Sequence, residues 1–434
     1  MNEKFYLGVG RATITPKVGA LLFGYVPDLE STSINDDLTA TAFCFEAGEE
    51  KALLVSLTVG NACLSIVDEI RDTVTKKYGI AKSSIIIAAI HTHSAPNLSG
   101  MHGWGEIDSE YLNEIFYPGV YAAIDDAVNS KKAVTMAVAK GESLIGVNRR
   151  EIMGDNTVRL GQNPWGPFDP TMTILSFKDE EGAPVANIIH YGAHATAAGA
   201  NKEVSRDWPG VMIDMLEAES GAITAFVNGP EGDVGPRLPN GRTTGGSVLA
   251  YALRHGAWAG QDAVRIYKNN MGVYHTPTLT TLGASVDIPL KPRIPLDEAK
   301  EAYELYRGET VNHRGHLEKY YREVIESYEN GFEEASVRTF EQNIIRIGDV
   351  AFVAFSHELF SEIGLRIKKE SKIPYVLSLS NSNGTNGYFA TESELCRGGY
   401  EIKMTNASSI QAHVDNADWY MMLETLKNLE KTEK

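Results

Sequence analysis

Short apolar, β-branched runs alternate with helical patterns along most of this chain. The runs cover residues 52–57, 84–90, 185–190, 222–227 and 350–355. Runs of this length and composition are typical of buried strands that helices cover. Between the first two runs, Ile70, Val74 and Tyr78 recur at helical spacing, which predicts a helix over 67–78 and a strand–helix–strand unit. The alternation therefore predicts an α/β fold with mixed, largely parallel sheets flanked by helices.

The chain is long enough for two or three domains, at roughly 150 residues per domain, but no linker divides it. The Pro/Gly-rich stretches at 161–170 and 228–246 lie between core elements and are typical of site loops. We therefore expect one continuous domain over 1–434. Residues 295–330 are charged and studded with aromatic side chains, which indicates a helical hairpin packed on the outside.

Charge and composition limit the function classes. The 57 acidic residues outnumber the 40 basic ones, which gives a net charge of −17. Such a charge opposes general binding to nucleic acid or to anionic lipid. No stretch approaches the ~18 apolar residues of a membrane span, and the start does not resemble a signal peptide. We expect a cytoplasmic protein with a small-molecule substrate, and the sequence does not indicate its oligomeric state. Three cysteines provide neither a disulfide framework nor a Cys-based zinc site.

Histidine and carboxylate side chains follow several of the expected strands. His91 and His93 come after the run at 84–90 and face the same way, because side chains alternate along extended backbone. His194 follows the run at 185–190 in a Gly/Ala-rich loop, and Glu358 follows the run at 350–355. Ligands of α/β sheets lie at the carboxyl ends of strands, so these side chains are candidate metal ligands. The alternative is structural: the histidines cap a strand by hydrogen bonds, and Glu358 caps the next helix.

A fourth strand end carries further polar residues. The run at 222–227 leads into a Gly-rich loop with Asn228, Glu231 and Asp233. Several strand ends that each carry His, Asp or Glu side chains are typical of a metal-dependent hydrolase.

Eight segments, in this order, resemble the neutral/alkaline (non-lysosomal) ceramidase-like family over nearly the whole chain. They are the opening GVGRATITPKVGALLFGY, HTHS at 91–94, NR at 148–149, the segment of His194, SRDWPG at 205–210, GDVGP at 232–236, Glu358, and GYFAT at 387–391 with GYE at 399–401. The resemblance implies a Zn²⁺ ion, one per chain, held by His91, His194, Glu358 and Tyr388. It also implies that His93, Arg149 and Tyr400 line the reaction centre, and we add Asp233 of the GDVGP loop as a catalytic candidate.

This chain departs from the family at Gly235, where the family's ceramidases carry the serine that resembles their nucleophile. Glycine has no side chain with which to attack, so we expect water activated by the metal to be the nucleophile. We also expect the chain to lack the C-terminal sandwich domain and the secretion signal of those ceramidases. The expected activity is zinc-dependent hydrolysis of an amide or related acyl or ester bond.

The loops around the site suggest the substrate. Arg237 in the Gly-rich loop suits a carboxylate or phosphate, and Trp104 with His102 suits a compact polar ring. With Asn228 as a further substrate-binding candidate, these residues predict a small polar substrate that can be anionic. Alternatively, the loop arginines are solvated charges. Two other functions stay open: a metal-stabilised binding protein without catalysis, and a metal-dependent enzyme acting on a sugar or phosphoester.

Overall fold

The structure is a computed structural model that describes residues 4–101, 104–309, 315–406 and 409–433. The strands are β1 (Phe5–Thr13), β2 (Ser33–Ile34), β3 (Thr39–Ala47), β4 (Glu50–Leu57), β5 (Ile85–Ala89), β6 (Lys132–Glu142), β7 (Gly146–Ile152), β8 (Val158–Asn163), β9 (Thr171–Asp179), β10 (Pro184–Tyr191), β11 (Glu203–Val204), β12 (Ile223–Asn228), β13 (Val234–Pro236), β14 (Leu279–Pro289), β15 (Val337–Ile347), β16 (Val350–Ala354), β17 (Glu358–Leu359), β18 (Tyr375–Leu379) and β19 (Tyr388–Phe389). The α-helices are α1 (Leu64–Tyr78), α2 (Ser109–Tyr111), α3 (Tyr117–Asn129), α4 (Asp207–Ser220), α5 (Ala250–Asn270), α6 (Leu296–Tyr306), α7 (His316–Ser327), α8 (Ser361–Glu370), α9 (Glu392–Leu395), α10 (Tyr400–Asn406) and α11 (Ala417–Lys431).

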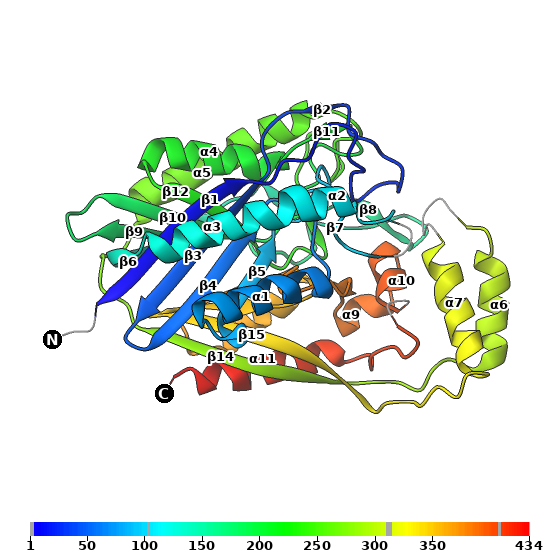
Figure 1. The fold of residues 1–434 in the computed structure, drawn as a ribbon. Helices are drawn as coiled ribbons and strands as arrows, with labels where there is room; N and C mark the ends of the chain where they lie inside the picture. The colour runs from blue at the N-terminus through cyan, green and yellow to red at the C-terminus, as the bar shows by residue number, and fades with distance from the viewer. Residues whose placement is uncertain (1–3, 102–103, 310–314, 407–408, 434) are drawn as a thin grey trace.

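Two sheets form the centre of the fold (Figure 1). The larger has eight strands in the order β12-β10-β9-β6-β1-β3-β4-β5, and the smaller has four in the order β14-β15-β16-β18. Their inner faces share one apolar core, in which Phe45 and Ile188 belong to the larger sheet and Phe352 to the smaller. Helices α1 and α3 pack on one part of the larger sheet's outer face, α4 and α5 on another, and α8 and α11 cover the smaller sheet. The strands of the larger sheet are apolar on both faces because helices cover one face and the smaller sheet covers the other.

The mixed α/β class is confirmed, but the expectation of largely parallel sheets is wrong. Within the two large sheets, only β4/β5, β10/β12 and β16/β18 are parallel, and the other pairs are antiparallel. Helices and the second sheet cover both faces of the larger sheet, so antiparallel strands here are as apolar as parallel ones. All five expected strands are present as β4, β5, β10, β12 and β16, and β4-α1-β5 is the expected strand–helix–strand unit.

The larger sheet curves so that its two edges approach each other. The Ser56 hydroxyl of β4 donates a hydrogen bond to the Phe226 carbonyl of β12 at 2.6 Å. Beyond the strand ends, the Asn228 side chain donates to the Ile90 carbonyl at 3.1 Å. This curvature brings the segments that follow β5, β10 and β12 together, although β5 and β12 are opposite edges of the sheet.

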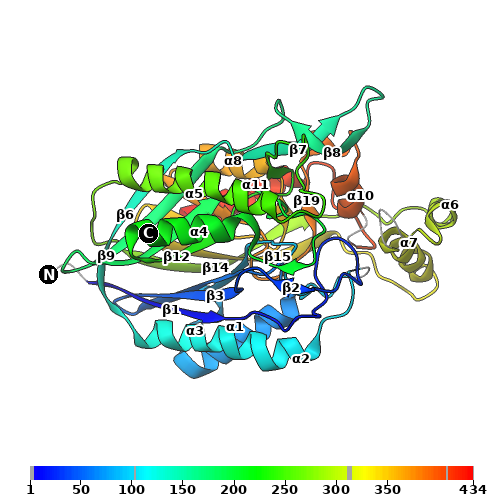
Figure 2. The ribbon, with the colours of Figure 1, turned by 90° about the horizontal axis from the view of Figure 1, so that it is seen from above.

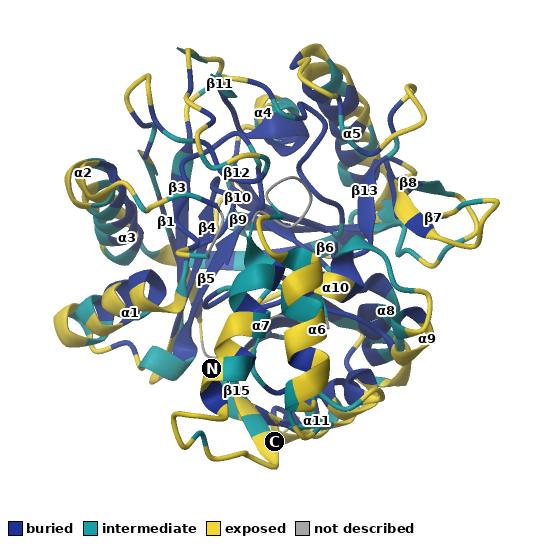
Figure 3. Ribbon diagram, turned by 90° about the vertical axis from the view of Figure 1, so that its right-hand side faces the viewer, coloured by how far each residue is buried: buried dark blue, intermediate teal, exposed yellow. Residues whose placement is uncertain are grey.

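The helical hairpin expected at 295–330 is present as α6 and α7, apart from residues 310–314, which lie outside the described ranges. The two helices pack through Tyr306 and Tyr321, whose rings stack at 5.7 Å. Figure 3 shows the hairpin in the foreground with exposed residues on both helices. It is not only an outer layer, because His316, Lys319, Tyr320 and Glu323 of α7 line a cavity described below. None of the helices in the described ranges is both long and apolar enough to cross a bilayer.

Candidate metal centre

Backbone carbonyls orient two buried imidazoles. His91 follows β5 in a left-handed conformation (φ 66°), and its Nδ1 lies 2.9 Å from the Gly60 carbonyl. His194 follows β10, and its Nδ1 lies 2.8 Å from the Glu231 carbonyl. Since a carbonyl only accepts, each Nδ1 is the protonated nitrogen and each Nε2 presents a lone pair. Metal-binding histidines in proteins are oriented in this way.

Glu358 and Tyr388 complete the donor set from neighbouring strands. The parallel pair β17/β19 places these two residues opposite each other. The Glu358 Oε2 atom lies 3.0 Å from His194 Nε2 and 3.4 Å from His91 Nε2. Despite this proximity, neither Glu358 Oε2 nor His194 Nε2 has an aligned hydrogen-bond partner among the described residues, and both are buried. Unpartnered buried donor atoms of this kind fit a cation.

The charge states at the centre favour cation binding. Burial opposes the ionisation of Glu358, but the adjacent histidines hold its pKa well below the usual range. Burial lowers the pKa of His194 to about 3, so its imidazole is neutral at physiological pH. A neutral imidazole and an ionised carboxylate are ligands that Zn²⁺ accepts.

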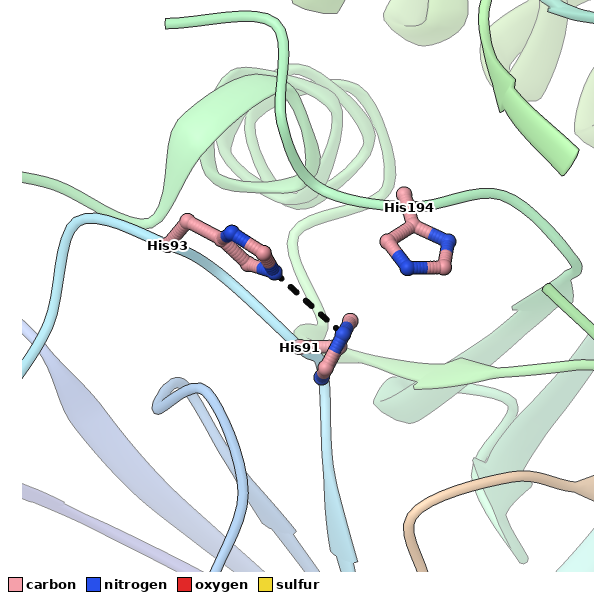
Figure 4. A group of neighbouring side chains, drawn as sticks. All are labelled: His91, His93 and His194. Carbon is pink, nitrogen blue, oxygen red and sulfur yellow. Dashed lines mark hydrogen bonds between the residues drawn. The ribbon is translucent and has the colours of Figure 1, made fainter. Parts of the chain in front are cut away.

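His93 joins the same cluster (Figure 4). Its Nε2 lies 3.3 Å from His91 Nε2, and its buried Nδ1 has no hydrogen-bond partner in the described part of the chain. Burial, followed by the neighbouring histidines, lowers the pKa of His93 well below its usual value. Ligand atoms of His91, His93 and His194 lie close enough together to hold one ion, and so do those of His91, Glu231 and Glu358. We refer to His91, His93, His194 and Glu358 as the His–Glu cluster.

Arg149 connects the cluster to the predicted tyrosines. Its Nη2 donates to the Tyr388 hydroxyl at 3.0 Å, and its Nε donates to Glu401 at 2.8 Å. The Tyr388 and Tyr400 rings are 5.9 Å apart. Burial and the Glu358 charge raise the pKa of Tyr388, which Arg149 opposes. The structure thus brings all four predicted metal ligands together with His93, Arg149 and Tyr400.

Asp233 is placed differently from the prediction. Its carboxylate accepts hydrogen bonds from the Ser361 backbone at 2.6 Å and from Asn148 Nδ2 at 2.9 Å. Burial raises the pKa of this carboxyl to about 7. Asp233 lines neither cavity at the cluster, so its contacts indicate that it positions β7 and the start of α8 rather than acting as a catalytic residue.

Two of the predicted substrate-binding residues lie away from the cavities. Asn228 is fully buried and bonds the Ile90 carbonyl and the Ala193 amide. Among the described residues, the Arg237 guanidinium donates to the Gly146 carbonyl at 3.4 Å. Both side chains thus bond the protein's own backbone outside the cavities, and their substrate contacts stay predictions. Trp104 does line the cavities, and His102 lies outside the described residues.

Sequence reasoning did not select Glu231 as a site residue. Its side chain is buried, accepts from Asn381 at 2.6 Å and has an unpartnered Oε2 beside the cluster. Burial and the Glu358 charge raise its pKa well above the usual value. The signal that could have identified Glu231 is its position in the Gly-rich loop after β12, close to the loop that carries His194.

Two cavities meet at the cluster. Cavity A, of about 300 Å³, lies between the cluster and α7. Cavity B, of about 780 Å³, lies between the β7–β8 hairpin, α10 and the loop at 243–244. Figure 2 shows β7 and β8 beside α10. Four residues line both cavities: His93, Trp104, Tyr388 and Tyr400. A molecule at the cluster can therefore extend in two directions.

Thr243 fills the space beside Gly235. A Cβ atom built at Gly235 would lie 2.6 Å from the Thr243 Cβ, far inside van der Waals contact. Thr243 is buried and lines cavity B. The glycine is thus part of the packing here, and a serine at position 235 would need Thr243 to move.

Comparisons with known proteins identify the family and the fold. Residues 5–248 match the family described as neutral/alkaline non-lysosomal ceramidase, N-terminal. A neutral ceramidase of Oryza sativa subsp. japonica is 23% identical over 227 residues, which are 49% of this chain and 29% of that protein. The crystal structure of neutral ceramidase from Pseudomonas aeruginosa aligns with a TM-score of 0.74 at 18% identity, over 100% of this chain and 75% of that one. A structure described as ceramidase complexed with C2 aligns with a TM-score of 0.72 at 17% identity, over 99% and 74%.

Fold and site together define a mixed α/β protein with a buried histidine–carboxylate centre. Because the family match covers more than half of the chain, this protein belongs to the neutral/alkaline non-lysosomal ceramidase family, a family of hydrolases. The predicted resemblance to this family is confirmed, and the predicted enzyme class agrees with that of the family. The matched region spans only 29% of the length of the rice relative.

Proposed function

We propose that this protein is a metal-dependent hydrolase that cleaves the amide bond of an N-acyl lipid of the ceramide type. The observation that carries the proposal is the buried His–Glu cluster with unpartnered ligand atoms at the junction of two cavities. Family membership and the names of the similar proteins support the bond type.

The lipid replaces the small polar substrate expected from the loop arginines. Arg237 and Arg242, the two arginines of the Gly-rich loop, line neither cavity, so they give no support to a small anionic ligand. Cavity A instead has apolar and aromatic walls, which suit part of an acyl chain. These walls are formed by Phe23, Met101, Trp104, Tyr320, Phe340 and Met404.

We assign the metal site to His91, His194, Glu358 and Tyr388, with zinc as the ion that suits nitrogen and anionic oxygen donors. When bound, zinc would polarise the amide carbonyl and lower the pKa of water. In the reaction, the oxygen of water adds to the acyl carbon, the C–N bond breaks, and a carboxylate and an amine are released. The metal identity is part of the proposal.

The chain's own residues carry the proton and the charge. His93 points its Nε2 at the cluster, 3.3 Å from His91 Nε2, so we propose that this nitrogen accepts a proton from water and passes it to the leaving nitrogen. Arg149 and Tyr400 both line cavity B at the cluster and would stabilise the oxyanion. Gly235 excludes covalent attack from the position of the family serine.

Hydrolysis of a fluorescent short-chain ceramide by the purified protein tests the proposal. We expect turnover that a chelator abolishes and zinc restores. The His93→Ala variant should lose at least about 100-fold in kcat, as expected for removal of a general base, while the surface variant His275→Ala should keep full activity. Absence of hydrolysis of any N-acyl lipid by fully metal-loaded protein would contradict the proposal and favour a metal-stabilised binding protein.

A further inference from the structure

The cationic character of cavity B stands out in an acidic protein. Four basic side chains line it, and no Asp or Glu does among the described residues. They are Arg149, Arg159, Arg397 and Lys403. The whole chain carries a net charge of −17, so a wall of one positive sign is not a property of the average surface.

Ion pairs neutralise only part of this charge. Behind the wall, Arg149 and Arg150 share Glu401, and Arg150 and Arg397 share Glu394. Three guanidinium groups therefore face two carboxylates, and one positive charge is left over.

Two further cations add to the excess. Arg159 lies 3.7 Å from Asp155, and both side chains are exposed, so this pair is weak. Lys403 is exposed on α10; its backbone N–H donates to the Gly399 carbonyl, and its side chain forms no ion pair or hydrogen bond with any described residue. Its ammonium group is thus available to a ligand.

Cavity A has no such excess. Lys319 lies 3.6 Å from Glu323, and both line the cavity. Arg338 is the second cation of its wall, and Glu358 is the second carboxylate, so the positive and negative side chains balance. Cavities A and B, on the two sides of the His–Glu cluster, therefore differ in charge. A bound amide that extends into both would have one part near balanced charges and the other near an excess of positive charge.

We propose that cavity B is an anion-binding subsite for the amine part of the substrate. On this basis the preferred substrate is an N-acyl compound whose acyl chain enters cavity A and whose amine part carries a carboxylate or sulfonate. The inference rests on the proposed amide hydrolysis and narrows its substrate class from neutral N-acyl lipids to anionic ones.

Matched amides test the subsite. N-dodecanoylglycine, N-dodecanoyltaurine and N-dodecanoylethanolamine share one acyl chain and differ in the charge of the amine part. We expect kcat/KM for one or both anionic amides to exceed that of the neutral one by about tenfold at low salt, with the difference shrinking as salt screens it. The ratio between glycine and taurine amides identifies carboxylate or sulfonate as the better anion.

Variants of Lys403 separate a ligand contact from general damage. Lys403→Gln should lower kcat/KM for the anionic amides about threefold to fivefold more than for the neutral amide, as expected for one exposed charge pair. Lys403→Arg should restore the preference, and Lys76→Gln on α1 is the matched surface control. Equal or faster hydrolysis of the neutral amide, or equal effects of Lys403→Gln on both classes, would overturn the subsite.

Binding measured without turnover keeps the two proposals apart. If no amide is hydrolysed, the proposed function fails, but calorimetric titration with the same three amides still tests the subsite. Tighter binding of the anionic amides, weakened by Lys403→Gln, supports cavity B as an anion site. Equal binding of all three refutes it.

Discussion

Packing of Thr243 against Gly235 predicts that a side chain at position 235 destabilises the fold. In Gly235→Ala the added Cβ would lie 2.6 Å from Thr243 Cβ and 3.0 Å from its Cγ2, at a site that is nearly closed to solvent. Forcing an extra methyl group into a packed site costs about 1–3 kcal/mol. Urea unfolding followed by circular dichroism should show this loss in the free energy of unfolding.

The double-mutant cycle with Thr243→Gly measures the clash itself. Thr243→Gly alone should cost stability, because it removes a buried side chain and adds backbone freedom. Since the three atoms nearest to the added Cβ all belong to the Thr243 side chain, the double variant should be more stable than the sum of the single effects by about 1–2 kcal/mol. Additive effects would refute the claim that Thr243 occupies the space of a side chain at position 235. Gly241→Ala is unsuitable as a control because of its positive φ, whereas Gly154→Ala has open space and an ordinary φ.

Three further outcomes are expected. His91→Ala and His194→Ala should each reduce bound zinc from about one per chain to below about a tenth, measured by elemental analysis, and full occupancy in both variants would contradict the site. Burial lowers the pKa of His255 to about 4, below its unfolded value of about 6.5, so acid protonates the unfolded chain first and stability is lost as pH falls from about 6.5 to 4. His255→Phe should remove about 2 kcal/mol of this acid-dependent loss, seen by comparing urea unfolding at pH 7 and 4.5, and an unchanged difference would contradict it. Arg150→Met, which leaves Glu394 and Glu401 short of a buried partner, should cost about 3–5 kcal/mol, whereas exposed Arg159→Met should stay within about 0.5 kcal/mol.

The apolar runs made three of the candidate ligands visible in the sequence. His91, His194 and Glu358 each follow a run that is a strand in the structure, and strand ends are where α/β proteins place ligands. What the runs could not show is why His91 and His194, which follow strands near opposite sides of one sheet, meet. That follows from the curvature of the sheet, which depends on contacts between residues far apart in the chain, such as Ser56 and Phe226.

Other parts of the site have no local signal. Tyr388 lies on a strand of two residues, and only the spacing shared with the family selected it. Asp233 and Arg237 looked like site residues because they lie in the Gly-rich loop, yet their side chains bond the protein's own backbone. A loop sequence reveals which polar groups are near a site, but not which of them the fold has already used.

The distance along the chain between the first and last proposed ligands has a consequence for how a metal would be acquired. His91 is made early, and Tyr388 comes near the end of the 434 residues. At about 5–20 residues per second of synthesis, some tens of seconds pass between the synthesis of His91 and His93 and that of Glu358 and Tyr388. During that time two imidazoles separated by one residue could capture a metal that prefers nitrogen, such as copper, before the oxygen donors arrive. Selection of the correct ion is therefore a property of the completed fold, and denatured protein should be refolded first and given zinc afterwards.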